Sequence, residues 1–62
     1  MITLKTTVNK IERTTTVTAT HSQYGAIYST WDNGTGGRVA ARLQAQALQD
    51  AEQHVRRLQA AR

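Results

Sequence analysis

Sixty-two residues fit one small domain, and a fold of that size has little room for the water-excluding cleft of an enzyme. The chain has no cysteine, which excludes disulfides and cysteine-ligated zinc. Eight Lys and Arg residues against four Asp and Glu give a net charge of +4, and this sign favours acidic partners, either nucleic acid or an acidic protein surface.

Neither a membrane span nor a signal peptide is evident in the hydropathy pattern. No apolar run approaches the roughly 18 residues of a span, and residues 1–5 lack a signal peptide's apolar stretch. We therefore expect a cytoplasmic protein with no membrane partner.

A domain of this size buries only about 60% of its unfolded surface, which leaves its stability marginal. We also expect stabilisation by a partner, either a second copy in a homodimer or another protein.

The first half of the chain has the composition of a β-sheet. Residues 2–31 hold nine of the ten threonines, together with the Ile, Val, Tyr and Trp that suit a pleated surface. Apolar and polar residues alternate there, which predicts strands near 2–9, 11–20 and 24–31.

The alternation in the first two predicted strands also indicates a register. A two-residue hairpin turn at residues 9–10 would place Val8 opposite Ile11 and Ile2 opposite Val17. This pairing puts the apolar residues of both strands on one face and leaves polar residues, most of them threonines, on the other.

The facing of the third predicted strand stays open. A three-residue loop at residues 21–23 would bury Ile27 and Trp31. A two-residue loop would instead bury Tyr24, Ala26 and Tyr28. The length of this loop therefore decides which aromatic side chains are exposed.

Residues 38–60 predict one long amphipathic helix. Ala, Leu, Gln, Arg and Glu dominate there, and Thr, Gly and Pro are absent. The apolar residues fall within one arc of about 140°; they are Ala40, Leu43, Ala47, Leu48, Ala51, Val55 and Leu58. The residues expected to meet where helix packs on sheet are Leu43, Leu48, Val55 and Leu58 against Ile2, Leu4 and Val17. An alternative interpretation makes residues 38–44 a fourth strand, with the preceding glycines as its hairpin.

These patterns predict an α+β fold in which residues 1–62 form a single β-β-β-α domain. Its sheet is antiparallel and three-stranded, or four-stranded under the alternative above. One long C-terminal amphipathic helix follows the sheet and packs on one of its faces.

The titratable residues form no recognisable catalytic motif. His21 is expected in a turn and His54 on the helix, and neither belongs to a set in which a nucleophile meets a base held by a third group. Asp50 and His54 are spaced i,i+4, but two ligands do not make a metal site. The glycine-rich segment 32–37 lacks the Gly-Lys-Ser/Thr of a phosphate-binding P-loop. We expect no enzyme activity, no metal and no cofactor.

The candidate contact residues are aromatic or basic. Tyrosine and tryptophan bring large contact area at low entropy cost, and arginine brings planar, bidentate recognition of carboxylate or phosphate. The candidates are Tyr24, Tyr28, Trp31, Arg38, Arg42 and Lys5. On an exposed sheet, basic and aromatic side chains also suit the stacking of single-stranded nucleic acid.

Two kinds of known protein share this outline. Three strands followed by a helix resemble the DNA-binding domains of phage integrases and plant AP2-type factors, and also the last three strands and helix of a double-stranded-RNA-binding domain. Segment 36–41 is similar to the helix start of the RNA-binding domain, although the Lys-Lys-x-x-Ala motif found there is absent. The Arg/Trp-rich strands of the DNA-binding domains are also absent. Threonine-rich strands, a tyrosine strand, a glycine loop and an Ala/Gln-rich helix also resemble small phage-encoded anti-CRISPR inhibitors. That resemblance implies a single chain that occupies a surface on a host CRISPR–Cas protein.

We therefore predict a non-enzymatic interaction protein, encoded by a phage or other mobile element, that binds and blocks a host protein such as a CRISPR–Cas effector in the host cytoplasm. The alternative is a DNA- or RNA-binding accessory module. Basic residues that converge on one face would favour nucleic acid, whereas scattered basic residues and a dominant aromatic surface would favour a protein. The basic residues in question are Lys5, Lys10, Arg13, Arg38 and Arg42.

Overall fold

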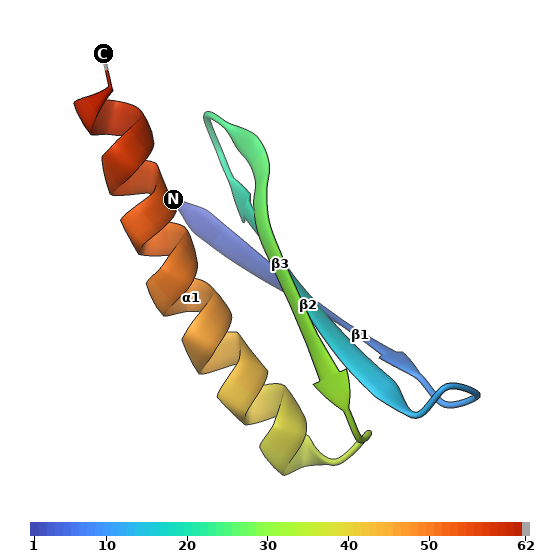
Figure 1. Ribbon diagram of the computed structural model, residues 1–62. Helices are drawn as coiled ribbons and strands as arrows, with labels where there is room; N and C mark the ends of the chain where they lie inside the picture. Colours follow the sequence, from blue (N-terminus) through green and yellow to red (C-terminus); the bar gives the residue numbers. More distant parts are fainter. Residues whose placement is uncertain (62) are drawn as a thin grey trace.

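The computed structural model describes residues 1–61, and its elements follow the order predicted from the sequence. Strands β1 (Ile2–Asn9), β2 (Thr14–His21) and β3 (Gly25–Asn33) precede a single helix, α1 (Gly37–Ala60). The strands form an antiparallel sheet in the order β1-β2-β3, and α1 lies along one face of it (Figure 1). The predicted α+β class, with three strands and one C-terminal helix, is confirmed.

The helix reading of residues 38–44 is the correct one. These residues belong to α1, so the alternative with a fourth strand is wrong. Residues of high helix propensity fill the segment. The preceding Gly36 is extended (φ −75°, ψ 159°), and the helix starts at once without a side-chain cap. At the other end the Ala61 N–H donates to the Arg57 carbonyl (3.0 Å).

The turn between β1 and β2 is longer than predicted, and the two-residue turn is wrong. Asn9 accepts hydrogen bonds on its side-chain oxygen from the N–H groups of Ile11 and Glu12, both at 3.0 Å. Arg13 then takes a left-handed conformation (φ 57°) that completes the turn. Val8 consequently faces Thr15, while Ile11 is 95% exposed.

The corrected register keeps the predicted faces. Ile2 pairs with His21 instead of Val17, a shift of four residues. Because side chains alternate with a period of two, an even shift leaves every side chain on its face. Val17 and Ala19 of β2 are fully buried, and Leu4 of β1 packs against the same core.

A β-bulge decides the facing of β3. The loop has three residues, 22–24, but the register shifts between Ala19 and Thr20, because Thr20 pairs with Ala26 and Ala19 with Tyr28. Ile27 is the extra residue, and side chains beyond it change faces. Tyr28 therefore packs against the core under α1 and Trp31 is 63% exposed on the opposite face, so neither loop-length rule is fully right.

The core is small and rich in alanine. It centres on Val17, Leu43 and Ala47, with Leu4, Tyr28 and Val39 packed around them. Of the helix residues expected at this contact, Leu43 and Val55 are buried and Leu58 is half-buried. Leu48 is 39% exposed, which corrects the prediction. The buried positions 43, 47, 51 and 55 recur every four residues, so Leu48 lies about 100° around the helix from Ala47, at the shoulder of the packed stripe.

Candidate functional site

The face of the sheet that α1 leaves uncovered is an array of hydroxyls around one tryptophan, and we call it the open face. Every second residue of each strand points to it. Its members are Thr3, Lys5, Thr7 and Asn9 of β1, Thr14, Thr16, Thr18 and Thr20 of β2, and Ala26, Ser29, Trp31 and Asn33 of β3. In β2 these alternate with Thr15, Val17 and Ala19, which are buried towards α1.

Cross-strand pairing arranges the open face in rows. Trp31 lies opposite Thr16, which lies opposite Thr7. In the next row the hydroxyl groups of Thr18 and Ser29 are 3.4 Å apart. Directly opposed side chains on a sheet lie about 5 Å apart at Cβ. Trp31 therefore stands beside short, β-branched side chains that leave its ring accessible.

The basic residues do not gather on the open face. Within residues 1–61 it carries a single charged residue, Lys5. Lys10 and Arg13 lie in the turn between β1 and β2, and Arg38 is exposed in the first turn of α1. Arg42 forms an ion pair with Asp32. The basic residues that were expected to discriminate between partners are therefore scattered.

Tyr28 fastens the helix to the sheet. Its hydroxyl donates a 2.8 Å hydrogen bond to the Asp50 carboxylate of α1. This hydrogen bond, followed by burial, raises the pKa of Tyr28 above its ordinary value. Tyr24 is the other predicted contact tyrosine. Its ring centroid lies 4.9 Å from that of His21, at the turn between β2 and β3. The structure thus places only Lys5 and Trp31 of the six predicted contact residues on the open face.

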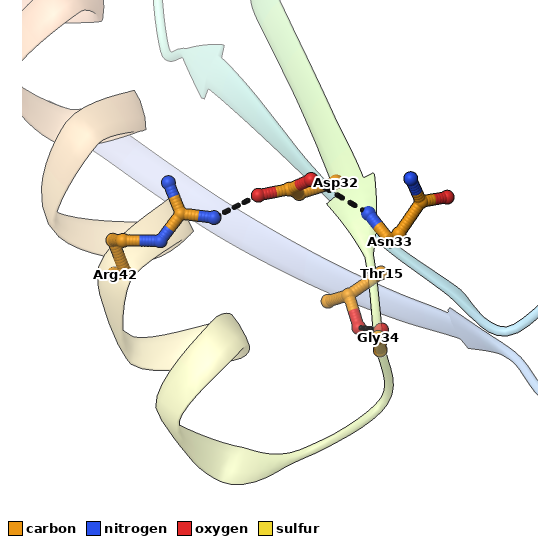
Figure 2. Close-up of polar contacts among 5 residues, drawn as sticks. All are labelled: Thr15, Asp32, Asn33, Gly34 and Arg42. Carbon is orange, nitrogen blue, oxygen red and sulfur yellow. Dashed lines mark hydrogen bonds and ion pairs between the residues drawn. The ribbon is translucent and has the colours of Figure 1, made fainter.

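Arg42 makes a second connection between helix and sheet. Figure 2 shows its guanidinium bonded to the Asp32 carboxylate, which also accepts the Asn33 backbone N–H at 2.8 Å. The Asn33 N–H first, and the Arg42 guanidinium second, lower the pKa of Asp32. No local pattern in the sequence indicates this partner of Arg42, because residues 32 and 42 lie on different elements and outside the i,i+4 spacing of helical charge pairs.

The acid dependence of stability should report on this ion pair. The pKa of Asp32 is lower in the folded chain than in the unfolded chain. The charged carboxylate therefore stabilises the fold at pH values above the unfolded-state pKa, and this stabilisation is lost as the pH falls through the folded-state pKa. We expect wild type to be more stable than Asp32→Asn at neutral pH, by a small amount because the pair is exposed. The difference should begin to shrink below about pH 4, near the unfolded-state pKa, and should vanish once the pH is below the lower, folded-state pKa.

Urea unfolding of both proteins across this pH range is the measurement. Glu12→Gln, which removes an exposed carboxylate in the turn between β1 and β2, is the control. A gap between wild type and Asp32→Asn that stays constant down to low pH would contradict the assignment.

The part of the chain that the structure describes contains no cluster of three His, Asp or Glu side chains able to hold a metal ion. Within the same residues, no helix is long and apolar enough to cross a membrane. Neither a protein-family model, nor a curated protein, nor a solved structure matches the chain.

Proposed function

We propose that this chain is a non-enzymatic binding module that attaches to a partner protein through the open face and blocks the surface that it covers. The observation that carries the proposal is the position of Trp31. Its side chain is 63% exposed on the sheet, away from the core. Tryptophan is among the residues most enriched at the energetic centres of protein interfaces.

The surroundings of Trp31 suit such a centre. Interface cores are depleted of charged residues, and the open face carries only Lys5 among the described residues. Threonine hydroxyls both donate and accept hydrogen bonds, so they can satisfy polar groups of either kind. The side chains are short and mounted on paired strands, so ordering them on binding costs little entropy.

Nucleic acid fits this surface less well. Binding to phosphates needs several cations that converge on one track. Here Lys10, Arg13 and Arg38 lie outside the open face, and Arg42 is engaged by Asp32. The scatter of basic residues favours the protein partner over the DNA- or RNA-binding module. The resemblance to phage-encoded inhibitors makes a CRISPR–Cas effector the first partner to test.

Trp31→Ala should separate a specific partner from background. We expect wild type to capture a protein from a nuclease-treated bacterial lysate, and Trp31→Ala to bind that protein at least about tenfold more weakly, because it removes the proposed centre. The matched control is Ile11→Ala, which removes an exposed apolar side chain from the turn between β1 and β2. Equal capture by all three proteins would refute the role of the open face. A purified CRISPR–Cas effector, assayed for target cleavage with each protein, tests the particular partner.

A second measurement tests the nucleic-acid alternative. Wild type is titrated onto random duplex and single-stranded DNA at low and physiological salt, and we expect no binding. Phosphate contacts release counterions, so affinity that depends on them falls steeply as salt rises. Micromolar or tighter binding with that salt dependence would overturn the proposal in favour of a nucleic-acid-binding module.

A further inference from the structure

The two edges of the sheet are not equivalent, and the β3 edge is obstructed. The Gly34 N–H donates to the Arg13 carbonyl (2.6 Å), so the preceding Asn33 directs its N–H away from β2. The Asp32 carboxylate accepts this outward N–H at 2.8 Å and is itself held by Arg42 (Figure 2). The bulge at Ile27 also interrupts the strand. Bulges and charged groups are devices that prevent a further strand from pairing with an edge.

The β1 edge is more accessible, because it has no bulge and its charged side chain, that of Lys5, points to the open face and not along the edge. Its pairing with β2 runs unbroken from Ile2 to Asn9. The Ser22 N–H donates to the Met1 carbonyl (3.0 Å), so odd-numbered residues of β1 bond to β2. The even-numbered residues therefore direct their N–H and C=O groups to the free side; they are Ile2, Leu4, Thr6 and Val8. Lys5 is the single charged residue of this strand.

A groove with both apolar and polar lining lies beside the same edge. It has a volume of about 350 Å³ and runs between the start of β1 and the second half of α1. Met1 and Leu48, which are among its lining residues, are exposed. Gln44, one helical turn before Leu48, donates to the Thr6 hydroxyl of β1 (2.8 Å), which places this side of α1 above β1. Exposed apolar surface beside an unpaired edge is a site for another polypeptide.

The charges of the groove indicate which polypeptide it takes. Each chain carries a net charge of +4, which opposes self-association elsewhere on its surface. Its lining carries both signs of charge: the Glu52 carboxylate on one hand, and the Arg56 guanidinium and the Met1 ammonium group on the other, with the imidazole of His21 beside them. In a two-fold interface each surface patch meets its own copy, so a patch that carries both signs is complementary to itself.

We propose that β1 pairs antiparallel with β1 of a second copy of this chain, about a two-fold axis at Leu4. Leu4 then faces the partner's Leu4, and Ile2 faces the partner's Thr6. An axis at Lys5 is excluded because it would set two ammonium groups directly opposite each other. With the axis at Leu4, Lys5 faces the partner's Thr3 instead.

The axis at Leu4 also covers apolar surface. It brings the two grooves to the same side of a sheet of six strands and covers Met1 and Leu48, which are exposed in one copy. The added burial supplies stability that a core of this size lacks. The dimer is independent of the proposed function, because the open face lies on the other side of the sheet.

Sedimentation equilibrium of the full chain up to high micromolar concentration is the test. We expect wild type to have a mass of about 13.8 kDa, twice the 6.9 kDa of one chain. Leu48→Lys should weaken the dimer at least about tenfold, because it places a cation on each side of the axis. Ile11→Lys, which adds the same charge at an exposed position outside the groove, should not.

Backbone methylation separates the two edges, since a chain of 62 residues is accessible to chemical synthesis. N-methylation of Leu4 blocks an outward N–H of β1 without removing a bond to β2, and the expected product is a folded monomer. N-methylation of Trp31 blocks the β3 edge in the same way and should leave the dimer intact. Circular dichroism establishes that each variant is folded. A monomeric wild type, or a dimer that survives methylation of Leu4 but not of Trp31, would overturn the proposal.

Discussion

Leu43→Ala is expected to lower the free energy of unfolding by about 2–5 kcal/mol. Leu43 is 1% exposed and contacts the centre of the core formed with Val17 and Ala47. The neighbouring buried helix residues are Ala47, Ala51 and Val55, which are too short to fill the space that a lost leucine leaves. A domain of this length has a total stability of about 3–9 kcal/mol, so the variant should lose a large share of it.

Urea unfolding followed by far-ultraviolet circular dichroism measures this loss. Ile11→Ala removes an aliphatic side chain that is 95% exposed, and its effect should stay within about 0.5 kcal/mol. At concentrations where the chain is monomeric, Leu48→Ala should cost less than Leu43→Ala, because Leu48 is partly exposed. Equal costs for Leu43→Ala and Ile11→Ala would show that the helix does not pack on the sheet through Leu43.

Gly34→Ala should destabilise the fold by about 1–3 kcal/mol, because its backbone occupies a region that side chains rarely adopt. Gly34 has φ +108°, and an added Cβ would lie 3.1 Å from Cγ2 of Val39. The carbonyl of Gly34 also accepts a 2.8 Å hydrogen bond from the buried hydroxyl of Thr15 (Figure 2). The same residue therefore ties the connection between β3 and α1 to the central strand.

A neighbouring glycine provides a control with the opposite expected sign. An added Cβ at Gly37, the first residue of α1, has no atom within 4 Å, and its φ lies outside the left-handed region. Gly37→Ala should stabilise the protein by about 0.4–1 kcal/mol, because alanine has fewer unfolded conformations to lose. Thermal unfolding of both variants measures the difference. Destabilisation of equal size by both substitutions would contradict the special role of Gly34.

The kinds of element and their order follow from the amino-acid sequence alone. The predicted helix 38–60 and the first predicted strand 2–9 agree with α1 (Gly37–Ala60) and β1 (Ile2–Asn9). Propensity and periodicity are local properties, so composition alone can reveal them. The faces of β1 and β2 were also predictable, because alternation survives any register error that is an even number of residues.

The way in which the strands pair depends on contacts between elements. The hydrogen bonds to the Asn9 side chain and the left-handed Arg13 lengthen the first turn, and the bulge at Ile27 reverses the facing of β3. A bulge depends on pairing across strands, so the spacing of residues within β3 could not predict it. Trp31 is exposed on the open face for this reason alone.

Contacts between elements also determine which of the candidate contact residues form hydrogen bonds within the fold. Tyr28 bonds to Asp50, 22 residues away along the chain, and Arg42 bonds to Asp32, 10 residues away. Both bonds join α1 to β3, and they form only because the helix folds back along the sheet (Figure 1). Hydrogen bonds between elements distant in sequence depend on packing, which no local pattern encodes. Composition alone identifies the aromatic and basic residues as candidates. Only packing separates Trp31 and Lys5, which lie on the open face, from Tyr28 and Arg42, which join the helix to the sheet.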